Sequence, residues 1–131
     1  MIATIISYES LNMESKVRAE SILFVECPRL KIALRLHRQT WEDHIKPFHP
    51  LEDKHLPIIE DIIKSANENQ PIWYKKNNPE RMCIVRQIAD FLPHNKFILI
   101  AFMRYSKTTG CITSIYPVDE LPAKEKGYKS L

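Results

Sequence analysis

The stretch "LPIIEDIIKSA", Leu56 to Ala66, carries the clearest helical periodicity in the chain. Its apolar residues recur every three or four positions and therefore fall on one face of a helix: Leu56, Ile59, Ile62, Ile63 and Ala66. Pro57 is tolerated in the first turn of such a helix, and Asn67 to Pro71 end it. The pattern predicts one main amphipathic helix, from Leu56 to Asn67, lying across one face of a sheet.

Four apolar or alternating runs follow this helix. They are separated by turn-forming segments, "NNPE", "DFLPHN" and "KTTG", and cover Ile72–Lys76, Arg81–Ala89, Lys96–Ser106 and Cys111–Tyr116. Short runs bounded by Pro, Asn, Asp and Gly are typical of β-strands. We therefore expect a four-strand antiparallel meander in which Ile98, Leu99 and Ile100 are buried together with Ile59, Ile62 and Ile63.

Two further apolar runs precede the helix. "SILFVEC", Ser21–Cys27, and "LKIALRL", Leu30–Leu36, are separated only by Pro28 and Arg29, which favours a β-hairpin. The second run alternates apolar and polar side chains, as a strand with one buried face does.

A short helix is predicted between this hairpin and the main helix. Thr40 offers an N-cap oxygen, Asp43 stands at the capping-box position, and Pro47 ends the helix. Trp41 and Ile45 lie one turn apart and are expected in the core. The predicted fold is α+β: a small antiparallel β-sheet, a meander, packed against one main helix and a short N-terminal helix.

The length of 131 residues and the hydrophobic fraction of 44% match one compact domain. We expect this domain to span residues 1–131. Residues 1–20 form an N-terminal extension whose pattern fits no single element, and residues 118–131 form a C-terminal tail.

The three cysteines, Cys27, Cys83 and Cys111, are odd in number and form no C-x-x-C pair. This argues against a disulfide framework and against a cysteine-rich zinc site, and it favours a reducing, cytoplasmic setting. The longest apolar run, Phe97 to Met103, is far shorter than the roughly 20 residues that span a bilayer, and no signal segment opens the chain. We expect a soluble protein without a membrane partner.

Positive charge is concentrated in the second half of the chain. Residues 1–70 hold nine Lys and Arg against eleven Asp and Glu, whereas residues 71–107 hold seven against two, a net charge of +5. The remaining residues balance at three and three. A basic region of this kind suits a polyanionic partner such as a nucleic acid.

The segment "TWEDHIKPFHP", Thr40 to Pro50, places two histidines at a helix end. His44, His49 and His55 are candidate metal ligands, but their spacings of five and six fit neither H-E-x-x-H nor a zinc finger. No cysteine sits in a recognisable nucleophile elbow, and no glycine-rich phosphate loop exists. We expect no metal and no cofactor.

Two histidines facing a basic, aromatic sheet are what metal-independent RNA cleavage requires. One imidazole removes the proton of the 2′-hydroxyl and another protonates the departing 5′-oxygen, while cations stabilise the phosphorane. His44 and His49 are the candidate acid and base. The sheet offers cations for phosphate and aromatic rings for base stacking: Lys75, Arg86, Arg104, Lys107, Trp73, Tyr74, Tyr105 and Tyr116.

The order of these motifs resembles the phage-associated branch of the barnase, EndoU, colicin D and RelE-like nucleases. Members tend to show W-x-x-H-I, then H-P-E, a helix, P-x-x-I, strands closing with I-T-A-Y, and a K-x-G tail. The matching segments here are "LRLHRQTWEDHIKPFHP", "QPIW", "CITSIYPVDE" and "KEKG", so the similarity covers about Leu30 to Gly127. Phe48 stands where a basic residue is common, Leu51 intervenes before Glu52, and "TSIY" is one residue longer than "TAY".

The resemblance implies a small α+β nuclease fold and metal-independent RNA cleavage, often in a toxin with a cognate inhibitor or antitoxin protein. Its motifs place His44 and His49 as acid and base and Ser114 and Tyr116 as substrate contacts. Lys75 and Arg104 are added from their charge and position. Two hypotheses follow: a metal-independent endoribonuclease that leaves 2′,3′-cyclic phosphate ends, or a catalytically inactive binding module of the same fold in a phage or toxin-system assembly.

Overall fold

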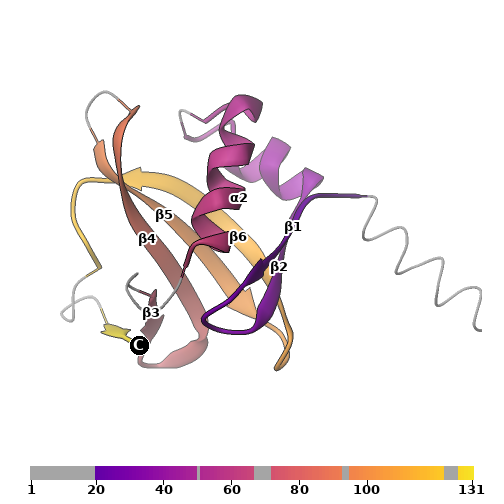
Figure 1. Ribbon diagram of the computed structural model, residues 1–131, viewed down its shortest axis with the longest axis vertical. Helices are drawn as coiled ribbons and strands as arrows, with labels where there is room; N and C mark the ends of the chain where they lie inside the picture. The colour runs from indigo at the N-terminus through magenta and orange to yellow at the C-terminus, as the bar shows by residue number, and fades with distance from the viewer. Residues whose placement is uncertain (1–19, 50, 67–71, 93–94, 123–126) are drawn as a thin grey trace, which may run out of the picture.

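A mixed β-sheet is the principal element of the chain (Figure 1). The computed structural model describes residues 20–49, 51–66, 72–92, 95–122 and 127–131. Within them, seven strands are hydrogen-bonded in the order β1-β2-β6-β5-β4-β3-β7. The elements in chain order are β1 (Ser21–Cys27), β2 (Ile32–His37), η1 (Thr40–Ile45), η2 (Asp53–His55), α2 (Leu56–Lys64), β3 (Ile72–Lys75), β4 (Asn78–Leu92), β5 (Asn95–Arg104), β6 (Thr109–Val118) and β7 (Tyr128–Ser130).

The predicted fold class, a small antiparallel sheet packed against one main helix and a short N-terminal helix, is wrong. The hairpin strand β2 pairs in parallel with β6, which joins β1 and β2 to the meander and makes the sheet mixed. The C-terminal tail adds β7, which pairs with β3. The helix α2 has only nine residues, and at its end the Ser65 hydroxyl donates a hydrogen bond to the Asp61 carbonyl. A seven-stranded sheet therefore dominates, and the helices are short.

The local strand predictions are confirmed. β1 and β2 form the expected antiparallel hairpin, and β3, β4, β5 and β6 pair antiparallel in succession. The strands are longer than predicted at several ends, since β4 runs for 15 residues. Three parts of the prediction lie outside the described residues: residues 1–19 of the extension predicted for residues 1–20, Asn67 at the end of the main helix, and residues 123–126 of the tail.

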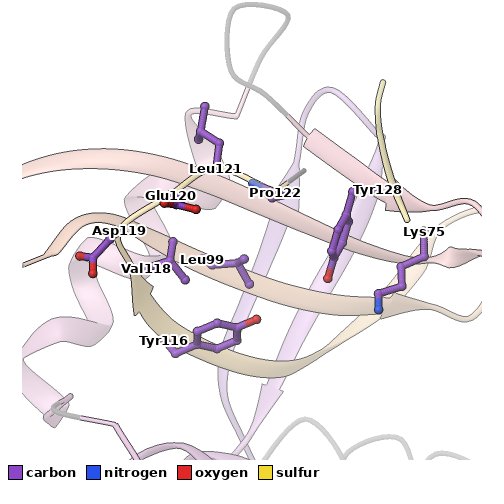
Figure 2. A pocket seen from close by; sticks show the side chains of 9 residues that line it. All are labelled: Lys75, Leu99, Tyr116, Val118, Asp119, Glu120, Leu121, Pro122 and Tyr128. Carbon is purple, nitrogen blue, oxygen red and sulfur yellow. The ribbon is translucent and has the colours of Figure 1, made fainter. Parts of the chain in front are cut away.

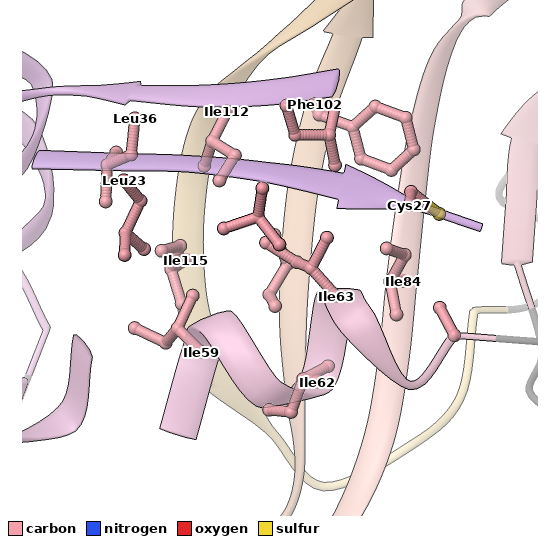
Figure 3. Close-up of a cluster of buried hydrophobic side chains, with 14 of the residues drawn as sticks. Leu23, Cys27, Leu36, Ile59, Ile62, Ile63, Ile84, Phe102, Ile112 and Ile115 are labelled. Carbon is pink, nitrogen blue, oxygen red and sulfur yellow. The ribbon is translucent and has the colours of Figure 1, made fainter. Parts of the chain in front are cut away.

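One face of the sheet, called here the covered face, carries Ile84, Ile98 and Ile100. This face packs against α2, and Figure 3 shows Ile84 beside Ile63 of the helix. Ile59, Ile62 and Ile63 of α2 are fully or almost fully buried there, as predicted. The helix also contacts β1, so the core lies between α2, the hairpin and the central strands. Arg86 ties the end of α2 to β4 through a 2.5 Å hydrogen bond to the Ser65 hydroxyl.

Replacing Ile62 with alanine is expected to lower the free energy of unfolding by about 2–5 kcal/mol, because a buried side chain is lost and a cavity remains. Ile62 is 1% exposed, whereas Ile58 on the same helix is 37% exposed and serves as the matched control. Urea denaturation measures both variants. Ile58→Ala should cost less than about 1 kcal/mol; equal losses for the two variants would contradict the packing described.

The opposite face, called here the open face, carries a second apolar cluster. Cys83, Val85 and Leu99 are buried beneath partly exposed side chains: Trp73, Phe97, Ala101, Tyr116, Val118 and Tyr128. A register shift occurs where Ala101 pairs with Ser114 but Phe102 pairs with Ile112, so Thr113 is an extra residue in β6. Because side chains alternate along a strand, this bulge decides that Ser114 and Tyr116 lie on the open face.

The short helix η1 is wound more loosely than an α-helix, since the amide of Lys46 donates to the carbonyl of Trp41, five residues earlier. Trp41 and Ile45 are buried, as predicted. The predicted Thr40 cap with Asp43 is wrong: Gln39 occupies the cap position and makes no side-chain cap bond. Helical conformation already begins at Arg38, so Thr40 lies inside the helical segment.

Candidate functional site

A groove on the open face is lined by residues of β3, β4, β5, β6 and β7. It consists of two adjoining cavities of about 530 Å³ and 220 Å³, which share Lys75, Tyr116 and Tyr128 as lining residues. Figure 2 shows the polar ends of these three side chains directed toward one another across the larger cavity. The groove is therefore a concave site with an aromatic floor and a cation at its centre.

The two ends of the groove differ in charge. Arg81, Thr113 and Ser114 line the smaller cavity, so this end offers two cations, Lys75 and Arg81, beside hydroxyl groups. Asp119 and Glu120 line the larger cavity at the other end. A phosphate group is attracted to the Lys75 and Arg81 end and repelled from the acidic end.

Lys75 is held over the ring of Tyr128, with its Nζ atom 5.1 Å from the ring centroid. Such a cation–π contact orients the ammonium group without neutralising it. Tyr128 belongs to β7, which is fixed along β3 by antiparallel pairing of Lys75 with Tyr128. The C-terminal strand thus supplies one wall of the groove and positions its central cation.

His49 stacks on Tyr116 beside the groove. The two ring centroids are 5.4 Å apart and the ring planes differ by 28°. Burial lowers the pKa of His49 from its ordinary value of 6.5, because the charged imidazolium is desolvated. Burial therefore favours the neutral imidazole, which can accept a proton.

The loop that carries His49 is anchored to the core by Trp41. The buried indole donates a 2.7 Å hydrogen bond from Nε1 to Oδ1 of Asp53, and Lys46 Nζ lies 3.1 Å from the same oxygen. The hydrogen bond from Trp41, followed by that from Lys46, holds the pKa of Asp53 below its ordinary value. The amide of His49 also donates to the carbonyl of Ile45, at 3.0 Å. These contacts fix where the imidazole lies.

Two further groups of the open face, the Tyr116 phenol and the Cys83 thiol, stay protonated at neutral pH. Burial, followed by the neighbouring Cys83, raises the pKa of Tyr116. Burial likewise raises the pKa of the Cys83 thiol to about 12. Tyr116 is thus a phenol that can donate a hydrogen bond or a proton, whereas Cys83 is not a nucleophile.

Four of the six predicted site residues lie together. Lys75, Ser114 and Tyr116 line the groove, and His49 contacts Tyr116. His44 is exposed on η1 and is not among the residues that line either cavity. Arg104 pairs with Gly110 on the covered side of the sheet, and its guanidinium donates to the carbonyls of Ser106 and Lys107.

Sequence reasoning missed Arg81 and Tyr128. Arg81 precedes Cys83 and Val85 by two and four positions, so strand alternation would have placed it on their face. Tyr128 follows Gly127 in the segment taken as a tail, and its three-residue strand is too short to give a periodic signal.

In the residues that the structure describes, no three His, Cys, Asp or Glu side chains gather as metal ligands. Nδ1 of His55 instead accepts a 2.8 Å hydrogen bond from the amide of Glu52. Elemental analysis of the purified protein is expected to find no stoichiometric zinc after dialysis against a chelator. One retained equivalent would require His44, His49 and His55 to be regrouped as ligands.

No protein-family model matches the chain, and no match was found among curated proteins or solved structures. Among the described helices, none is both long and apolar enough to cross a membrane.

Proposed function

We propose that the protein is a metal-independent endoribonuclease that binds single-stranded RNA in the groove of the open face. The observation that carries this proposal is the stack of His49 on Tyr116, at a groove whose cations are Lys75 and Arg81. The motif order shared with the barnase, EndoU, colicin D and RelE-like nucleases supports it, and we propose membership of their phage-associated branch. A cytoplasmic setting is part of the proposal, since Cys27, Cys83 and Cys111 are all free thiols.

The proposed reaction is an internal transesterification. Neutral His49 takes the proton of the 2′-hydroxyl, the 2′-oxygen bonds to phosphorus, and the bond from phosphorus to the 5′-oxygen breaks. Lys75 and Arg81 stabilise the added negative charge of the phosphorane. The phenol of Tyr116 is the candidate donor of a proton to the departing 5′-oxygen. The products are a 2′,3′-cyclic phosphate and a free 5′-hydroxyl.

The test is cleavage of a single-stranded RNA in EDTA by purified protein freed of any inhibitor, with chemical analysis of the new ends. Cyclic phosphate ends support the proposal, and 3′-hydroxyl ends or a metal requirement would refute it. Lys75→Gln and Arg81→Gln should each weaken RNA binding. Each should also reduce the salt slope, which is the steepness with which the logarithm of the binding constant falls with the logarithm of the salt concentration, by about 0.7, the value for one phosphate contact on a single strand. Arg104→Gln is the matched control, since Arg104 lies on the other side of the sheet.

The pH dependence of cleavage provides a separate prediction. Because burial lowers the pKa of His49, its basic form persists as pH falls below 6.5. The acidic limb of the profile of kcat/KM against pH should therefore have its midpoint below 6.5. His49→Ala should abolish this limb in any residual activity. A midpoint above 6.5 would contradict the assignment of His49 as the base.

A second candidate function is a binding module of the same fold without catalysis. The position of His44, exposed on η1 and outside the cavity linings, favours it, because the groove is then served by one histidine. This module would bind RNA or a cognate inhibitor protein with acidic side chains that cover Lys75 and Arg81. Wild-type protein that binds RNA tightly but leaves it intact would select this function.

A further inference from the structure

A row of residues that pair across neighbouring strands extends the open face beyond the groove. Arg81 pairs with Met103, Met103 with Cys111, Cys111 with Arg35, and Arg35 with Phe24. Register partners project to the same side of a sheet. The row therefore begins at the cationic end of the groove and crosses β5, β6 and β2 to reach β1.

The far end of this row presents a cation beside an aromatic ring. The guanidinium carbon of Arg35 lies 5.0 Å from the centroid of the Phe24 ring, and Phe24 is 49% exposed. Through its terminal nitrogens a guanidinium group can bind a phosphate, and the exposed ring beside it can stack on a base.

Tyr105 adds a second exposed ring to the same side. It follows Met103 by two positions, and a hydrogen bond with Cys111 together with burial raises the pKa of its hydroxyl. The side chain of Tyr105 thus lies by Cys111, in the middle of the row, although the residue is 69% exposed. Both rings retain surface for stacking.

We propose that Phe24, Arg35 and Tyr105 form a second RNA subsite, which binds nucleotides flanking the cleaved one. The proposal rests on the proposed function and deepens it: the substrate is a single strand several nucleotides long, laid across the strands of the sheet. Three strand spacings separate Arg81 from Arg35, a distance of about 14 Å. A few nucleotides of an extended strand bridge this gap, with phosphates near the two arginines.

RNA is favoured over a protein partner by the combination of groups. Exposed rings alternate with arginines along the row, and stacking on rings next to cations is how proteins bind single strands without reading their sequence. The region from residue 71 to 107, which supplies Arg81, Met103 and Tyr105, carries a net charge of +5. An acidic protein is the competing occupant and is included in the test.

The test compares binding of two single-stranded 2′-O-methyl RNAs, a trimer and a nonamer, which cannot be cleaved through the 2′-oxygen. Fluorescence anisotropy measures the Kd of each for the wild type, Phe24→Ser, Tyr105→Ser and Arg35→Gln. Lys64→Gln, an exposed cation on α2 against the covered face, is the matched control. Thermal melts check folding, and Arg35→Lys keeps the charge at position 35 should the glutamine variant unfold.

The affinity for the nonamer should fall about 5- to 100-fold in Phe24→Ser and Tyr105→Ser, whereas the affinity of these variants for the trimer should not change. Lys64→Gln should bind both RNAs as tightly as the wild type does. Arg35→Gln should reduce the salt slope for the nonamer by about 0.7. Equal losses for trimer and nonamer, or no loss, would overturn the subsite. Binding of polyglutamate, which stands in for an acidic protein, is measured with the same variants. If these variants bind RNA like the wild type but no longer bind polyglutamate, the row is assigned to an acidic protein and the RNA subsite is overturned. Cleavage of an unmodified trimer is measured separately, so failure of catalysis is distinguishable from failure of the subsite.

Discussion

Replacement of His49 by alanine should reduce the rate of the proposed RNA cleavage by about 10²- to 10⁴-fold, the range expected when a general base is removed. The free energy of unfolding should change little, because His49 is partly exposed and its ring stacks on Tyr116 at the surface of the groove. Single-turnover cleavage of a short RNA at saturating protein measures the chemical step. Urea denaturation of the same preparation measures stability.

His44→Ala is the matched control for this experiment. His44 is five residues away and exposed on η1, so its loss should leave the rate within about threefold of the wild type. An equal and large loss for both variants would restore His44 as the second acid or base. A negligible effect of His49→Ala on the cleavage rate would contradict the proposal that His49 is the general base at this groove.

Replacement of Trp41 by alanine should lower the free energy of unfolding by about 3–5 kcal/mol, as loss of a large buried ring typically does. Trp41 is 1% exposed, and its indole also anchors the loop of His49 through Asp53. Urea denaturation measures the loss, and cleavage at low temperature measures whether the surviving folded protein is active. Because the anchor is lost as well, activity should fall further than the folded fraction does.

Trp41→Phe separates the two contributions, since it keeps an aromatic ring and deletes the hydrogen bond. The hydrogen bonds from Trp41 and Lys46 lower the pKa of Asp53 from its ordinary value of 3.8. Their contribution to stability is therefore fully present above pH 3.8 and is lost as pH falls through the lowered pKa. Stability below pH 3.8 should decline less steeply in Trp41→Phe than in the wild type, and identical slopes would contradict the anchor.

The local elements of this fold could be predicted from sequence, whereas their long-range arrangement could not. The period of Ile59, Ile62 and Ile63 defines α2, and the turns around Pro28 and Thr108 delimit strands. Nothing local indicates that β2 pairs in parallel with β6, because register partners far apart in sequence leave no periodic signal. The predicted fold class failed at that point.

The candidate site shows the same division. Lys75 and Tyr116 were found from their residue types, but Arg104 shares the parity of Ile98, Ile100 and Phe102 and hence the covered side. The sequence does not show on which face Arg104 lies, because β5 has apolar side chains on both faces and so lacks an alternating pattern. The bulge at Thr113 is a further case: the extra residue of "TSIY" decides which side chains reach the groove, and a bulge has no compositional signature.

The parallel pairing of β2 with β6 also has a consequence for how the protein is made. Ala33 pairs with Thr109, 109 − 33 = 76 positions later in the chain. A ribosome therefore releases the hairpin and α2 long before their partner strand exists, and such distant pairings form slowly. The groove is lined by residues of β6 and by Tyr128 of β7, so it is complete only after Tyr128 has emerged from the ribosome. Under the proposed function, a nascent chain is therefore unable to cleave the messenger RNA that encodes it until Tyr128 has emerged from the ribosome.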